Sequence, residues 1–168
     1  MPIIDYDDGT RILDGIPAYY QGDTRRCGQA CTASVLGYFG YHVTFDDLVE
    51  QTAGTAGALG MSMEQIVWTL RKYGLQARSF TGRLQDLKTQ INKSNPVIVA
   101  FDEGDIQHVV VVIGYNDERE LIFYNDSMDG CTMEEPYSDF IRAWSRRRAN
   151  SSGFFDGSVA NMLIQVSR

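Results

Sequence analysis

The chain has 168 residues, and its hydrophobic content of 43% and charged content of 22% are typical of an ordinary globular domain with a sizeable core. Its formal net charge of -7 argues against nucleic acid as the main partner, because phosphate binding needs clustered lysine and arginine. No run of about 18 apolar residues is present, so the sequence predicts no membrane-spanning helix.

The first residues are acidic and lack the basic and apolar regions of a cleaved signal peptide. We expect residues 1–18 to form an irregular or edge-strand lead-in, with turns at Asp8-Gly9 and Asp14-Gly15. The cysteines are three in number and form no dense disulfide framework, which favours a reducing compartment. The expected location is therefore the cytoplasm, or the exterior after export without a cleaved signal peptide.

A polar loop passes into a helical pattern between Gln21 and Phe39. The helix is expected to begin at Cys27, where free backbone N–H groups and the helix dipole favour an anion. A thiolate is the nucleophilic form of cysteine, and Arg25 and Arg26 add positive charge beside it. This position therefore makes Cys27 a candidate nucleophile.

Gln21 lies upstream of Cys27 with five residues between them. Its side-chain amide is a donor that could meet an oxyanion, and the backbone N–H of Cys27 would be the second donor. Cys31 lies one helical turn after Cys27, and we assign it to the core, where free cysteine is usually buried. The segment thus supplies a nucleophile and an oxyanion donor but no general base.

The following residues predict two more helices with a loop between them. Thr44 is expected to cap a short helix over residues 45–52. Small residues from 53 to 60 indicate a mobile loop at the rim of a cleft. Ser62 and Gln65 form a capping box that opens the next helix.

The pattern then becomes extended, with a continuous valine-rich run that predicts a central strand. The expected strands are residues 75–80, 96–101, 107–115, 120–125 and 159–166. Short helices are expected at 84–91 and 136–144. Because helices come first and an antiparallel sheet follows, the fold class is α+β.

The chain offers two histidines as a general base. His42 follows the first helix, and we expect a surface or packing role for it. His108 opens the valine-rich strand, where a histidine is either a satisfied core residue or a catalytic group at the strand end. A cysteine at a helix start and a histidine at a strand start can hold a thiol against an imidazole across a helix–sheet cleft, which favours the catalytic reading.

A catalytic base also needs a third group that fixes its tautomer and orientation. Asn125 and Asp126 end the strand that follows the strand of His108, and either could serve. Side chains alternate along a strand, so only one of the two is expected to point at His108. Periodicity alone does not choose between them.

Taken in order, these motifs resemble those of the bacteriocin-processing family of papain-like cysteine peptidases, whose peptidase domains remove double-glycine leader peptides. That family shows Gln, five residues and then Cys-Gly-x-Ala-Cys, which matches Gln21 and residues 27–31. The other matches are Tyr38-Phe39-Gly40, Gly60-Met61-Ser62 with Gly74-Leu75 after its helix, the strand from His108 to Val112, Asp126 with Gly130, and Phe140 with Trp144. The resemblance covers about residues 19–144.

The resemblance implies a papain-like fold, with a helical N-terminal half packed on a C-terminal antiparallel sheet and the active site in the cleft between them. It implies Cys27 as nucleophile, His108 as general base and acid, Asp126 as orienting acid, and Gln21 in the oxyanion hole. It thereby favours Asp126 over Asn125.

We expect residues 19–168 to form one peptidase domain, of which residues 145–168 extend beyond the usual core. Arg26 stands where the family usually has Asp, and Ser127 where it has Pro. We interpret the chain as a free-standing relative that hydrolyses peptide or protein substrates through a thioester, either as a leader-processing peptidase or as a secreted effector protease. No cofactor or metal is expected.

Other functions fit the same residues. A non-catalytic peptide-binding module would keep the fold, but an electrophilic peptide would not label Cys27. A thiol acyltransferase or deamidase would use the same nucleophile and differ in its product. A zinc site from Cys27, Cys31 and His108 lacks both the usual cysteine spacing and a fourth ligand.

Overall fold

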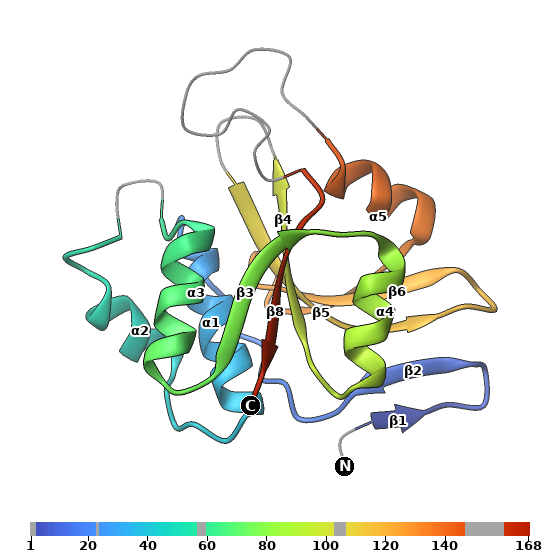
Figure 1. Ribbon diagram of the computed structural model, residues 1–168, viewed down its shortest axis with the longest axis horizontal. Helices are drawn as coiled ribbons and strands as arrows, with labels where there is room; N and C mark the ends of the chain where they lie inside the picture. The colour runs from blue at the N-terminus through green and yellow to red at the C-terminus, as the bar shows by residue number, and fades with distance from the viewer. Residues whose placement is uncertain (1–2, 23, 57–59, 103–106, 147–159) are drawn as a thin grey trace.

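The computed structural model describes residues 3–22, 24–56, 60–102, 107–146 and 160–168 (Figure 1). These residues form five helices and eight strands. The helices are α1 (Cys27–Tyr38), α2 (Phe45–Gln51), α3 (Met63–Lys72), α4 (Leu84–Asn92) and α5 (Tyr137–Trp144). The strands are β1 (Ile3–Asp5), β2 (Thr10–Leu13), β3 (Gln76–Thr81), β4 (Val97–Asp102), β5 (Gln107–Asn116), β6 (Leu121–Asp126), β7 (Cys131–Pro136) and β8 (Met162–Ser167).

The described strands join in one antiparallel sheet with β5 at its centre. The strand order is β1-β2-β5-β4-β8-β3, and β6 and β7 continue the sheet from β5. β5 pairs with β4 over residues 107–112, with β2 over 114–116 and with β6 over 111–116. The C-terminal strand β8 lies between β4 and β3, so the end of the chain is part of the sheet.

Helices cover both faces of this sheet, which explains why β5 is apolar and buried from Val109 to Ile113. Along β5, Val109 and Val111 pack into the core on the side of α1 and α3. Val110 and Val112 face the opposite core, which α4 and α5 cover. Figure 1 shows the sheet standing between α1–α3 and α4–α5.

Local sequence signals set the helix starts as expected. Thr44 caps α2 in a reciprocal capping box with Asp47, and Ser62 caps α3 in the same way with Gln65. The Gln65 side chain also donates to the carbonyl oxygen of Thr55 at 2.8 Å, which ties the start of α3 to the segment that follows α2. Residues 57–59 of the expected mobile loop lie outside the described residues.

The α+β class and the packing of the N-terminal helices on an antiparallel sheet are confirmed. The hairpin β1–β2 lies in the expected lead-in before the helices, and α4 and α5 lie between strands at the expected places. Strand β7 was not expected. Its side chains are mostly exposed at the edge of the sheet, so it carries no apolar signal. The last strand begins at Met162 rather than 159, and residue 159 lies outside the described residues.

None of the helices formed by the described residues has both the length and the apolar character needed to cross a lipid bilayer.

Candidate active site

Cys27 is the first residue of α1 and is half-buried. Its neighbour Gly28 packs against the segment before α3, where an added Cβ would lie 2.7 Å from the Cβ of Met61. Glycine therefore lets that segment approach the first turn of α1. The Cys27 Sγ lies 3.9 Å from the carbonyl oxygen of Gln107, the first residue of β5. The thiol thus faces the start of the strand that carries the histidine.

His108 follows Gln107 in β5 and is 2% exposed. Its Nε2–H donates to Asp126 Oδ1 at 2.7 Å, and Asp126 is the last residue of the neighbouring strand β6. The same carboxylate oxygen accepts the backbone N–H of Met128 at 3.0 Å. Because Nε2 is engaged by Asp126, Nδ1 is the ring nitrogen that remains for the thiol of Cys27.

The electrostatics of this group favour a charged histidine. Burial lowers the pKa of His108, but hydrogen bonds with Asp126 and Cys27 outweigh burial and raise it from 6.5 to about 10. Burial raises the pKa of Asp126, but the hydrogen bond and the charge of His108 outweigh that and lower it. An imidazolium–carboxylate pair therefore persists across neutral pH.

Strand alternation separates the two candidates at the end of β6. Asn125 is buried and its Oδ1 accepts a hydrogen bond from Thr132 Oγ1 at 2.7 Å, on the edge strand β7. Asp126 points to the other side of the strand, toward His108. Of the two side chains, that of Asp126 forms the hydrogen bond with the histidine, and that of Asn125 forms one with Thr132.

Gln21 is buried beside this group and its side chain is held at both ends. Its Nε2 donates to the carbonyl oxygen of Thr24 at 2.5 Å, and its Oε1 accepts from the Ser127 hydroxyl. The Gln21 backbone N–H also donates to the Ser127 carbonyl oxygen at 2.9 Å. A primary amide has two N–H bonds, so after the bond to Thr24 one N–H of Gln21 has no hydrogen-bond partner among the residues that the structure describes.

The sequence alone predicts no role for Ser127, which stands where the resembled family has proline. A serine in place of proline adds a hydroxyl donor next to Asp126, and this hydroxyl donates to the side chain of Gln21.

The other candidates lie outside this group. Cys31 is 2% exposed, its Sγ donates to the carbonyl oxygen of Val109 at 3.3 Å, and burial raises the pKa of its thiol well above the usual range. His42 is exposed in the loop after α1. Among the described residues, no group of three or more His, Cys, Asp or Glu side chains is placed to hold a metal ion.

A family model described as the Peptidase_C39-like family matches residues 13–152. The chain belongs to the Peptidase_C39-like family. The resemblance inferred from the order of the motifs is therefore confirmed, and the kind of protein that this membership supports is a peptidase. A search of curated proteins gave no match.

Solved structures of C39 peptidase domains share this fold. The peptidase domain of Streptococcus ComA, a bifunctional ABC transporter involved in quorum sensing, aligns with a TM-score of 0.65 and 21% identity over 90% of this chain and 98% of that domain. A double-glycine motif protease from an AMS/PCAT transporter, solved in complex with the leader peptide, aligns with a TM-score of 0.64 and 21% identity. The alignment covers 92% of this chain and 95% of that protease. The peptidase domain of Streptococcus mutans ComA aligns with a TM-score of 0.56 and 17% identity over 90% of this chain and 98% of that domain.

Proposed function

We propose that this C39-like protein is a cysteine peptidase that hydrolyses peptide bonds through a thioester, with Cys27, His108 and Asp126 as its catalytic residues. The observation that carries the proposal is the chain of contacts from Asp126 through His108 to Cys27, built from the ends of three different elements. A buried imidazole that is held by a carboxylate and faces a half-exposed thiol is the arrangement that peptide hydrolysis by a thiol nucleophile requires.

Before the attack, the thiol proton of Cys27 is transferred to His108, which leaves a thiolate beside an imidazolium. The thiolate attacks the peptide carbonyl carbon, an S–C bond forms, and the carbonyl π electrons move to the oxygen. When the oxyanion collapses, the C–N bond breaks and the leaving nitrogen takes the proton from His108. Water then gives a proton to His108 and attacks the thioester, and the C–S bond breaks to return the thiolate. Throughout, Asp126 holds the ring and stabilises its charged form.

We assign oxyanion stabilisation to the free N–H of Gln21 and to the backbone N–H of Cys27. The first turn of a helix leaves backbone donors unpaired, so the N–H of Cys27 is available there. The hydroxyl of Ser127 holds Gln21 Oε1, which keeps the amide from flipping its oxygen toward the oxyanion. Ser127 is therefore a positioning residue rather than a catalytic one.

Replacement of Gln21 by alanine is expected to lower kcat by roughly 10²–10³, because one oxyanion donor is lost. Ser127→Ala keeps that donor but releases its orientation, so we expect a smaller loss, of about tenfold, with KM unchanged. Ser127→Thr keeps a hydroxyl and should restore most of the rate. Steady-state kinetics on one peptide substrate measure all three. Equal rates for the Ser127→Ala variant and the wild type would contradict the positioning role.

A peptide or protein is the substrate that this proposal implies. The structural neighbour from the AMS/PCAT transporter is described in complex with the leader peptide, which supports a peptide as the ligand of this chain as well. The departures at Arg26 and Ser127 leave the choice between leader processing and an effector role to experiment. Digestion of a proteome-derived peptide library, with the Cys27→Ala variant as the blank, identifies the cleaved sequences.

The ion pair predicts how stability depends on pH. Because the pKa of His108 is raised, its contribution to the free energy of unfolding is fully present below pH 6.5. That contribution is lost as the pH rises through about 10. The lowered pKa of Asp126 means that its contribution is present above 3.8 and is lost as the pH falls below that value. Urea unfolding of wild type and Asp126→Asn should therefore differ most between pH 3.8 and 6.5. A difference that stays constant up to pH 10 would contradict the pairing.

A further inference from the structure

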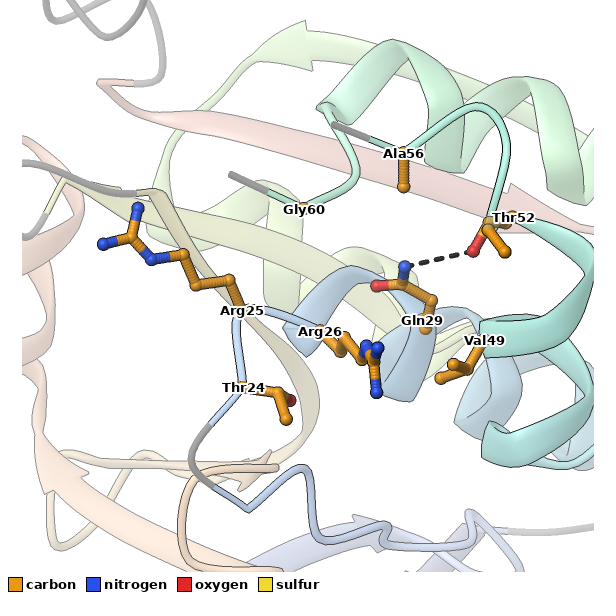
Figure 2. A pocket seen from close by; sticks show the side chains of 9 residues that line it. Thr24, Arg25, Arg26, Gln29, Val49, Thr52, Ala56 and Gly60 are labelled. Carbon is orange, nitrogen blue, oxygen red and sulfur yellow. Dashed lines mark hydrogen bonds between the residues drawn. The ribbon is translucent and has the colours of Figure 1, made fainter. Parts of the chain in front are cut away.

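A cavity of about 360 Å³ lies on the side of α1 that faces α2 (Figure 2). Among the described residues, its walls are formed by residues 24–26 before α1, by Gln29 of α1, by Val49 of α2 and by residues 52, 53, 56 and 60. At one border the backbone of Gly60 lies against Arg25, so closely that an added Cβ would be 2.1 Å from the Arg25 carbonyl oxygen. The cavity therefore adjoins the loop that leads directly into Cys27.

One buried side chain presents an unpaired acceptor to this cavity. Gln29 is 3% exposed, and its Oε1 has no hydrogen-bond partner among the described residues. Its Nε2 donates to Thr52 Oγ1 at 3.1 Å, a bond drawn in Figure 2. The Thr52 hydroxyl donates its one proton to the carbonyl oxygen of Leu48 at 2.7 Å, so it acts as an acceptor toward Gln29. The amide is thus oriented with its oxygen toward the cavity.

An unpaired buried carbonyl destabilises a protein unless a ligand or solvent supplies a donor. A ligand that fills this cavity must therefore carry an N–H or O–H group at its inner end. The apolar wall, which includes Val49 and Ala56, suits methylene groups behind that donor.

The charged residues at the rim of the cavity further restrict the chemical class of ligand that it can bind. Arg25 and Arg26 both line the cavity and are exposed, and neither forms a salt bridge with any described residue. Two guanidinium groups that have no salt-bridge partner among the described residues repel a cationic donor such as a lysine side chain. They favour a ligand acceptor instead. A carboxylate would satisfy them, but it has no proton to donate to Gln29 at neutral pH.

We propose that this cavity binds the carboxamide side chain of a glutamine or asparagine residue of the substrate. A carboxamide is neutral and carries both an N–H donor for Gln29 and a carbonyl acceptor for the arginines. The proposal rests on the peptidase function proposed above and assigns it a specificity site. Because the site is separate from the Cys27–His108–Asp126 group, its binding can be measured without turnover.

The binding test uses N-acetylglutamine amide as the probe and ¹⁵N-labelled Cys27→Ala protein. We expect N-acetylglutamine amide to shift the side-chain NH₂ signals of Gln29 in a saturable way, while N-acetylnorleucine amide, N-acetylglutamate amide and N-acetyllysine amide shift them little. Equal shifts with norleucine, or no shift with glutamine, would overturn the proposal. This result does not depend on whether the protein is an active peptidase.

The specificity test compares peptide-library cleavage by wild type and Gln29→Leu. We expect glutamine or asparagine to be enriched by about tenfold or more at one fixed position from the cut by wild type, and the enrichment to disappear in Gln29→Leu. Enrichment of acidic, aromatic or basic residues there would overturn the carboxamide assignment. Gln51→Leu is the matched control, because Gln51 lies on α2 with its side chain bonded to Tyr73 and does not line the cavity.

Folding of the variant is a separate readout. Leucine at position 29 removes an unpaired acceptor from a buried place, so the thermal midpoint of Gln29→Leu should equal or exceed that of wild type. If Gln29→Leu fails to fold, Thr52→Val tests the same orientation, since it removes the hydroxyl that accepts from the Gln29 amide and donates to the Leu48 carbonyl oxygen. Retention of the full preference in Thr52→Val would count against the proposed orientation.

Discussion

Replacement of Cys27 by alanine is expected to abolish peptide hydrolysis, with kcat falling on the order of 10⁶-fold to the level of a blank. The physical reason is that no other thiol can take its place. Cys31 is buried against the backbone of β5, and Cys131 is exposed on the edge strand β7. The measurement is cleavage of a peptide found in the library digest, followed by chromatography of the products.

Cys131→Ala is the matched control, because it removes an exposed thiol that lies outside the proposed site. It should keep wild-type kinetics. In that background an electrophilic peptide should form one adduct, at Cys27. Hydrolysis that survives in Cys27→Ala would refute the assignment, and a wild-type protein that forms no adduct would favour a peptide-binding module instead.

Replacement of Asp126 by asparagine should lower kcat by about 10⁴-fold while leaving the fold intact. The carboxylate accepts the Nε2–H of His108 at 2.7 Å and helps to raise the pKa of the imidazole to about 10. An amide of the same shape removes the negative charge and can present a donor to the ring, which favours the wrong tautomer. The remaining activity should therefore also show its histidine titration at lower pH than wild type.

The pH profile of kcat/KM separates this role from a structural one. A merely structural Asp126 would change the amplitude of the profile but leave its titration in place. Asp129→Asn is the matched control, since Asp129 is an exposed carboxylate three residues further along. An Asp126→Asn enzyme with wild-type kcat would remove the orienting acid from the proposed mechanism.

Local signals in the sequence were enough for most of the fold. Capping at Thr44 and Ser62 and the valine-rich run of β5 depend on neighbouring residues, so they can be read without knowing the tertiary structure. The edge strand β7 was missed, because an exposed strand needs no apolar pattern and forms only when β6 offers it backbone partners. The position of β8 between β4 and β3 likewise depends on pairing between distant residues.

The chemical groups of the site can be read from the amino-acid sequence alone, as a cysteine at a helix start, a histidine at a strand start and an acid at the end of the next strand. The family can be read from it too, because the order and spacing of several weak motifs are jointly specific. The contacts between these groups depend on the folded chain. Asp126 reaches His108 while Asn125 turns to β7, Ser127 holds Gln21, and the oxygen of Gln29 at the cavity has no partner among the described residues. Such outcomes depend on direction and distance in space, and hydrogen bonds are lost within about an ångström of misplacement.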